Sequence, residues 1–585
     1  MSKYRLISLL FLLSPLSLLA QTPTWVNGQA ARVLIGQATW AFGSLAMPNQ
    51  STLGAAGGVA YANGTLWVAD ATTMTGLNPN NGLPIPSGVT SGTYTQDARV
   101  LGFPTSSIPL PDADLTPFAA ETCSVCGFSA NIVLGQTNFT TFAPGTSRSA
   151  TSGTGSMNDP TGVASDGNRL AVADYGNNRV LLWNATPNSI NAPPDIVLGQ
   201  ASFTTNSSSV TSATFRGPQG VWINPDGHVF VADAINNRVL IWNHFPTSNG
   251  QPADVVLGQT NFNTGTQPAC NISVVGETVT TAANQLCNPT SVTSDGTRVY
   301  VADFGFNRVL IWNSIPSNDG QPADVVLGQP NMTTAIANNT SNNFCPDGNG
   351  PVSTITNTSS SGVVSTIVTG GQCNTNLDQP SFAVADAASN QLFVADTGNG
   401  RVLVYSPIPT TSGVAASAVL GQPSFVAQVN SSQSTSIAST QINNIAAVDV
   451  VPAPTSVAYD PVTRNLFVAD PTNNRVLVFT PGQSPLPLNS ILNWASGIIR
   501  QEGVVTFSAG PSSTTPVAND TTTVTISGTN YTYTIKKGDT FDSIAQGEVS
   551  AINSSNSGAG DPNAFATFSG TGTGSLYLSS KGVNL

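Results

Sequence analysis

The sequence predicts an all-β protein, namely a six-bladed β-propeller closed by an N-terminal strand, followed by a small C-terminal α+β module of ββαββ order. A strand-like phrase ending in Val-Ala-Asp recurs in six successive units. Turn signals at strand-like spacing separate the copies. Only 8% of the residues are charged and 40% are hydrophobic, in regular Val/Ile/Leu segments. This composition favours a folded, β-rich exported protein over a disordered chain.

The N-terminus predicts export. Lys3 and Arg5 precede an apolar run over residues 6–19, and Ala20 follows it. The pattern is typical of a secretory signal peptide, residues 1–20, cleaved after Ala20. A membrane anchor is the alternative, but the run falls short of the ~20 residues that a spanning helix needs. With no later candidate span, we expect a secreted, periplasmic or cell-surface protein.

Each complete copy of the phrase ends one strand in Asp and begins the next with Arg after a short polar turn. The two side chains face each other across a hairpin, so we expect them to bond each other or the turn and to serve the architecture. The first copy, Trp67–Asp70, lacks the Asn-Arg half. The complete copies contain Asp174 and Arg179, Asp233 and Arg238, Asp303 and Arg308, Asp396 and Arg401, and Asp470 and Arg475.

Two further strands complete each unit. One precedes Val-Ala-Asp and ends in a tight turn such as Asp166-Gly167. The other carries Val-Leu-Gly-Gln, so each unit has the four antiparallel strands of a propeller blade. The last unit lacks this strand downstream, and we predict that Arg32–Gln37 supplies it and closes the ring. Arg99–Gly102 stays unassigned, with a decayed strand in the first insertion as one interpretation.

The phrase Val-Ala-Asp…Asn-Asn-Arg-Val-Leu resembles the NHL repeat family of β-propellers. The resemblance covers about residues 27–482 and implies a six-bladed propeller of NHL type. It departs in the first unit, where Thr72–Gly76 stands in place of the Asn-Asn-Arg turn. Some similar propellers are zinc lyases that hold the metal with several histidines, but this chain has only His228 and His244.

No catalytic, cofactor-binding or metal-ligating set of residues emerges from the sequence. Other six-bladed propellers hydrolyse lactones or esters with calcium held by Glu, Asn and Asp. A metal-dependent hydrolase or lyase with calcium in the central channel therefore remains an alternative function.

Six cysteines fit the oxidising destination of an exported chain. Proximity in sequence suggests two disulfides, Cys270–Cys287 and Cys345–Cys373. Cys123 and Cys126 are separated by two residues, which leaves a structural bridge, free thiols, a redox pair or half of a zinc site open.

The chain after the repeats is a separate piece. Residues 483–519 are rich in Pro, Ser, Thr and Gly and are interpreted as a linker. Residues 520–585 predict the ββαββ module from an alternating hairpin, a capped amphipathic helix and two short strands. Residues 533–545 resemble the opening of LysM, a peptidoglycan-binding module. This resemblance implies contact with the cell wall, and a cell-wall-associated structural or adhesive protein is a further alternative function.

The composition excludes one class of partner. The net charge is −12, and no lysine lies between Lys3 and Lys536, so the clustered cations that nucleic-acid binding needs are missing. We expect a non-catalytic exported scaffold that binds a protein or glycan. The repeat cores are alike, so specificity should lie in the insertions 331–379, 262–288 and 424–454. We expect these insertions on one face, with the Asp-to-Arg turns on the opposite one.

Overall fold

The structure is a computed structural model. It describes residues 25, 27, 31, 33–37, 48–71, 98–108, 126–141, 144–149, 156–266, 281–340, 343–346, 348, 353–358, 364–369, 371–422, 425–426, 453–481, 502–506, 521–526, 529–555, 564–568 and 575–580. The predicted signal peptide lies outside these residues. No helix in the described part of the chain is long and apolar enough to cross a membrane.

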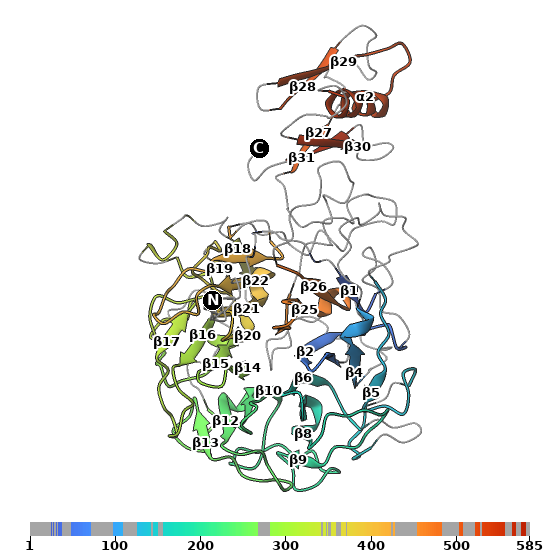
Figure 1. Cartoon of the computed structure of the whole chain (residues 1–585). Helices are drawn as coiled ribbons and strands as arrows, with labels where there is room; N and C mark the ends of the chain where they lie inside the picture. The colour runs from blue at the N-terminus through green and yellow to red at the C-terminus, as the bar shows by residue number, and fades with distance from the viewer. Residues whose placement is uncertain are drawn as a thin grey trace, which may run out of the picture.

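Within the described residues, six four-stranded antiparallel sheets form the blades of a propeller (Figure 1). Blade 1 comprises β2 (Ala56–Ala62), β3 (Thr65–Asp70), β4 (Arg99–Pro104) and β5 (Ile132–Leu134). Blade 2 comprises β6 (Pro160–Ser165), β7 (Leu170–Asp174), β8 (Arg179–Trp183) and β9 (Ile196–Leu198). Blade 3 comprises β10 (Pro218–Ile223), β11 (Val229–Asp233), β12 (Arg238–Trp242) and β13 (Val255–Leu257). Blade 4 comprises β14 (Pro289–Ser294), β15 (Val299–Asp303), β16 (Arg308–Trp312) and β17 (Val325–Leu327). Blade 5 comprises β20 (Pro380–Asp386), β21 (Gln391–Asp396), β22 (Arg401–Tyr405) and β23 (Ala418–Leu420).

Blade 6 combines the two ends of the propeller and confirms the predicted closure. It comprises β24 (Ser456–Tyr459), β25 (Leu466–Asp470) and β26 (Arg475–Phe479), with β1 (Val33–Ile35) added outside β26. Leu34 pairs with Leu477 at the centre of this contact. In Figure 1 the blue β1 lies beside the orange β26. The ring therefore presents no open edge at its seam.

The inner strands of the blades surround the axis, and each packs against the inner strands of both neighbouring blades. Apolar side chains fill the spaces between blades. For example, Phe230 and Ile241 of blade 3 share one core cluster with Val301 and Trp312 of blade 4. The strand-end aromatics Trp242 and Trp312 are fully buried in these interfaces. Alternation along each strand supplies both faces of a blade, since successive side chains point to opposite sides.

Blade 1 corrects one interpretation of the sequence. Arg99–Gly102 is not a decayed strand within an insertion, because β4 pairs with β3 along its whole length and provides the third strand of the blade. Arg99 lies opposite Asp70, as Arg179 lies opposite Asp174 in blade 2. The chain between Asp70 and Arg99 is far longer than the turns of the other units, which hid this partnership in the sequence.

In the five complete units, a single 3-10 turn joins the Asp strand to the Arg strand. The residue before each Arg has a left-handed backbone, with φ of 50° at Asn178 and 58° at Gly400. Asn and Gly adopt this conformation more readily than other residues, which explains their place in the repeat. The turns are η2 (Tyr175–Asn177), η3 (Ala234–Asn236), η4 (Phe304–Phe306), η6 (Thr397–Asn399) and η9 (Pro471–Asn473), and η1 (Thr105–Ser107) follows β4 in blade 1.

Among the described residues, three pieces lie outside the blades. The insertion between blades 4 and 5 forms a hairpin of β18 (Ser353–Thr358) and β19 (Val364–Thr369). The C-terminal module contains a hairpin of β28 (Thr521–Ile526) and β29 (Thr529–Thr534), the helix α2 (Phe541–Asn553), and the strands β30 (Ala564–Phe568) and β31 (Ser575–Ser580). A further strand, β27 (Glu502–Thr506), comes from the segment interpreted as a linker and pairs with β31. Thr540 caps α2 through the backbone N–H of Ser543.

Candidate functional site

The insertions and the Asp-to-Arg turns lie on the same face of the propeller, so the prediction of opposite faces is wrong. In blade 2, Asp174 pairs with Arg179 on one side and with Pro160, the first residue of the inner strand, on the other. Leu198, at the end of the outer strand, pairs with Val180 next to that turn. Four antiparallel strands bring the chain back to this end before it enters the next blade. We call this end of the propeller the loop face.

Every blade carries a buried Asp–Arg ion pair at the loop face. Each Arg donates from Nε to the Asp Oδ2, and both side chains are at most 1% exposed. The N–O distances are 2.8 Å for Asp70 and Arg99, 2.6 Å for Asp174 and Arg179, 2.8 Å for Asp233 and Arg238, 2.8 Å for Asp303 and Arg308, 2.7 Å for Asp396 and Arg401, and 2.8 Å for Asp470 and Arg475.

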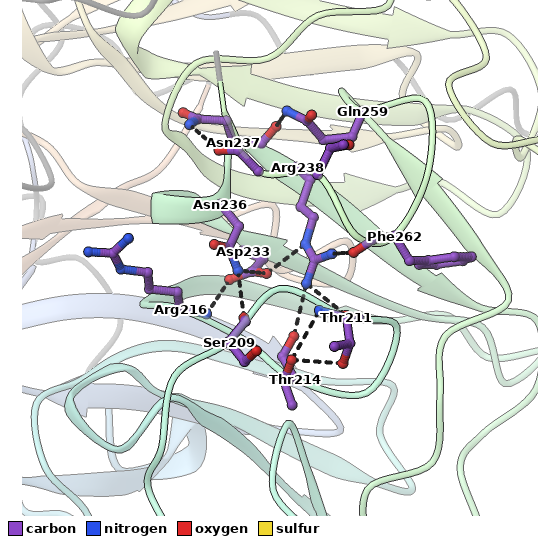
Figure 2. Close-up of polar contacts among 12 residues, drawn as sticks. Ser209, Thr211, Thr214, Arg216, Asp233, Asn236, Asn237, Arg238, Gln259 and Phe262 are labelled. Atoms are coloured by element: carbon purple, nitrogen blue, oxygen red, sulfur yellow. Dashed lines mark hydrogen bonds and ion pairs between the residues drawn. The ribbon is translucent and has the colours of Figure 1, made fainter. Parts of the chain in front are cut away.

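In blade 3 the ion pair holds two loops at once (Figure 2). Arg238 donates to the carbonyl of Phe262, in the loop after the outer strand, at 2.5 Å. It also donates to the carbonyls of Thr211 and Thr214, in the loop before the inner strand, at 2.9 Å each. Asp233 accepts the backbone N–H of Arg216 at 2.7 Å. The guanidinium group thus fixes the start of one insertion and the end of another.

The Asn and Gln residues of the repeat hold the same loops. Asn237 donates to the carbonyl of Gly265 at 3.1 Å and accepts the N–H of Asn288, at the entry to blade 4, at 2.8 Å. Asn236 donates to the carbonyl of Ser209 at 3.0 Å. Gln259, from Val-Leu-Gly-Gln, donates to the carbonyl of Asn237 at 3.1 Å. The loop ends are therefore hydrogen-bonded to the blades, and Asn237 also links blade 3 to blade 4.

Burial governs the electrostatics of the ion pairs. Desolvation raises the pKa of Asp303 to about 6, although the positive charge of the Arg308 guanidinium lowers it. Burial also raises the pKa values of Asp174, Asp233 and Asp396. These carboxylates are closed to solvent and already bonded, so they offer no free group to a ligand.

Two acidic residues that sequence reasoning missed lie beside these pairs. Burial, followed by the charge of Asp174, raises the pKa of Asp159 to about 7. Burial, followed by the charge of Asp396, raises the pKa of Asp378 to about 7. Both precede the first residue of an inner strand, which the antiparallel register brings to the Asp of the repeat. The pairing of the start of each inner strand with the Asp of the repeat is the signal in the sequence that points to them.

The insertion 331–379 is fastened to the loop face by more than the repeat. Cys345 and Cys373 form the predicted disulfide, with a sequence separation of 28. The side-chain amides of Asn338 and Asn399 bond each other in both directions at 2.9 and 2.8 Å. The buried Gln329 donates to the carbonyl of Ile336 at 2.8 Å and accepts from Asn339 at 3.1 Å. These contacts give the β18–β19 hairpin an ordered base.

The other cysteine predictions are tested only in part. Cys287 and Cys126 are both disulfide-bonded. Cys270 and Cys123 lie outside the described residues, so the Cys270–Cys287 pairing stays a prediction.

A cavity of about 30 Å³ lies on the propeller axis, between the inner strands of all six blades. It is lined by Gly57, Gly58, Thr161, Gly162, Val163, Gln219, Gly220, Val221, Thr290, Ser381, Phe382, Thr455 and Ser456. None of these residues is charged. Calcium prefers carboxylate-rich oxygen sites, so this lining does not fit the channel calcium that the sequence left open. Among the described residues, no cluster of three or more His, Cys, Asp or Glu could hold a metal ion.

The comparison with family models agrees with the fold. The model of the NHL repeat matches residues 157–181 and 215–242, which fall in blades 2 and 3. No curated protein matches the sequence. The solved structure of Kuenenia stuttgartiensis hydrazine synthase is similar to 74% of this chain and 98% of that chain, at 12% identity and a TM-score of 0.33. Values this low carry no inference about function. The chain is a six-bladed β-propeller, two of whose blades match the NHL repeat.

Proposed function

We propose that this protein is an exported, non-catalytic scaffold that captures a protein partner at the loop face through the insertion 331–379. The observation that carries the proposal is the way in which the repeat holds this insertion. Arg308, Asn307 and Gln329 bond the carbonyls of Met332, Ala335 and Ile336. A loop that is ordered before binding loses less conformational entropy on capture, which favours recognition.

The β18–β19 hairpin favours a protein over a glycan as the partner. Among the described residues it forms a two-stranded sheet of its own, paired over Ser353–Thr358 and Val364–Thr369. Its strands contain no charged residue and no proline, the features that usually protect a sheet edge from pairing. An extended segment of a partner can add to such an edge through backbone hydrogen bonds. NHL propellers commonly serve as protein-binding scaffolds, which supports the same reading.

Export is part of the proposal. The Cys345–Cys373 disulfide fits an oxidising compartment outside the cytosol, and the N-terminal residues 1–20 have the pattern of a signal peptide. Contact of residues 520–585 with the cell wall, suggested by the likeness of residues 533–545 to LysM, stays a prediction.

The experiment removes the hairpin and keeps its base. Residues 353–369 are replaced by a short Gly-Ser turn, which leaves Cys345 and Cys373 in place. The untrimmed and trimmed proteins are each used in a pull-down from cell-surface extract, and a photo-crosslinker at Thr356 or Thr366 of the untrimmed protein maps the contact by mass spectrometry. We expect a crosslinked protein that the trimmed variant no longer captures.

A matched control changes the opposite face. Val462, which is 84% exposed on the hairpin between β24 and β25, is replaced by Ser. This variant should capture the partner as the wild type does. Equal capture by the trimmed protein would contradict the proposal.

A further inference from the structure

Hydroxyl groups link the inner strands around the propeller axis. In blades 1 to 5 the inner strand has an irregularity in its register at its second residue, and in blade 6 the equivalent residue, Thr455, directly precedes β24. Where the residue at this position is Ser or Thr, its hydroxyl donates to a carbonyl of the neighbouring inner strand or of the residues just before it. The bonds are Thr161 to Gln219 at 3.0 Å, Thr290 to Ser381 at 2.8 Å, Ser381 to Thr455 at 3.1 Å, and Thr455 to Ala56 at 3.2 Å.

Two positions break this ring. Blade 1 has Gly57, which has no side chain, and blade 3 has Gln219, whose side chain is longer. Gln219 is 4% exposed, and among the described residues neither its Nε2 nor its Oε1 has a hydrogen-bond partner. A buried polar group without a partner is strongly destabilising, so these two atoms of Gln219 call for a ligand.

The axial cavity lies at these gaps. Gly57, Gln219 and Thr290 all line it. The cavity is small because glycines let the blades approach closely. A Cβ built on Gly220 would lie 2.7 Å from the carbonyl oxygen of Thr290 and 2.8 Å from the Cα of Ser291. Trp222 packs against core clusters on both sides of the ring and fills part of the axis.

We propose that the axial cavity is a binding site for a small cluster of ordered water molecules, held by the carboxamide of Gln219, that completes the ring of hydrogen bonds between the inner strands. Size supports water, since a volume of about 30 Å³ at roughly 10–15 Å³ per molecule accommodates about two. Chemistry supports it as well. Among the described residues, the carboxamide of Gln219 presents a donor and an acceptor without partners. Water satisfies both kinds of group, whereas a cation would satisfy acceptors only.

The first test removes the groups that hold the water. Gln219→Leu is close in size and has no polar atom. Oxygen-17 magnetic relaxation dispersion counts long-lived internal waters, and a crystal structure at high resolution locates them. We expect the variant to lose about two waters relative to the wild type, with a Tm that stays the same or falls. A wild-type cavity without density, together with a higher Tm for Gln219→Leu, would overturn the proposal, because replacing a carboxamide that is dry relieves its desolvation.

The second test supplies the missing hydroxyl group and does not depend on the first variant folding. A Cβ at Gly57 would lie 3.4 Å from the carbonyl oxygen of Thr161, which is ordinary contact. Gly57→Ser should displace one water, bond that carbonyl directly and raise the Tm above that of the size control Gly57→Ala. Equal Tm values and unchanged water counts for the two variants would count against the ring. A Tm that depends on sodium or potassium, compared with choline chloride at equal ionic strength, would mean that a monovalent cation, and not water, occupies the cavity.

Discussion

Replacing Arg238 with Met should loosen the loop face and destabilise the whole propeller. The change keeps an unbranched side chain of similar length but removes the charge and all four hydrogen bonds that Arg238 donates. One of these goes to Asp233 and three go to loop carbonyls. Asp233 would stay buried without its cation, and the carbonyls of Phe262, Thr211 and Thr214 would lose a donor.

The magnitude follows from these contacts. Breaking a buried ion pair by removing one partner costs about 3–5 kcal/mol. The double variant Asp233→Asn/Arg238→Met also removes the isolated charge of Asp233. The cost that then remains is the loss of the hydrogen bonds that Arg238 donates to the loop carbonyls. Each carbonyl left unsatisfied costs roughly 1–3 kcal/mol. The double variant should therefore recover part of the stability and remain about 3 kcal/mol or more below the wild type.

Urea unfolding gives the free energies, and hydrogen exchange locates the change. We expect faster exchange at the amides of residues 209–214 and 262–265, whereas β11 stays protected. Arg216→Met is the matched control because it removes the same charge from an exposed side chain of the same blade. It should change stability by less than about 0.5 kcal/mol. A double variant within about 1 kcal/mol of the wild type would refute the view that the guanidinium holds the loops.

Three further predictions concern other parts of the fold. The native pKa of Asp159, about 7, exceeds its ordinary value of 3.8. The stability that its proton contributes is therefore full below about pH 4 and is lost as the pH rises through 7. Asp159→Asn should reduce the fall in the urea midpoint between pH 5 and pH 8, and an unchanged fall would mean that other groups cause it. Cys373→Ser opens a loop of 28 residues and should destabilise the insertion by about 3–4 kcal/mol, seen as proteolysis there that the blades resist. Leu34→Pro removes an N–H from β1 and should expose β26 to hydrogen exchange; retained protection of Leu477 would show that the ring closes without β1.

The sequence by itself determined the features that repeat at short range. Asp and Arg five residues apart predicted a hairpin, and the structure pairs Asp174 with Arg179 across it. The copies of Val-Leu-Gly-Gln, with Arg32–Gln37 as the last, predicted six blades and their closure, which β1 and β26 form. Such features are readable because alternation along a strand, a tight turn and a fixed spacing are local consequences of the residues themselves.

Only the tertiary structure decided which distant residues meet. Arg99 completes the ion pair of blade 1 across 29 residues, a distance at which spacing predicts nothing. The loops and the Asp-to-Arg turns share a face because of the direction in which four strands alternate, which the repeat phrase alone does not display. The carboxamide of Gln219, which has no partner in the described part of the chain, depends on the approach of six inner strands to one axis. Contacts of this kind arise from packing between blades, and packing acts on residues that the chain keeps far apart.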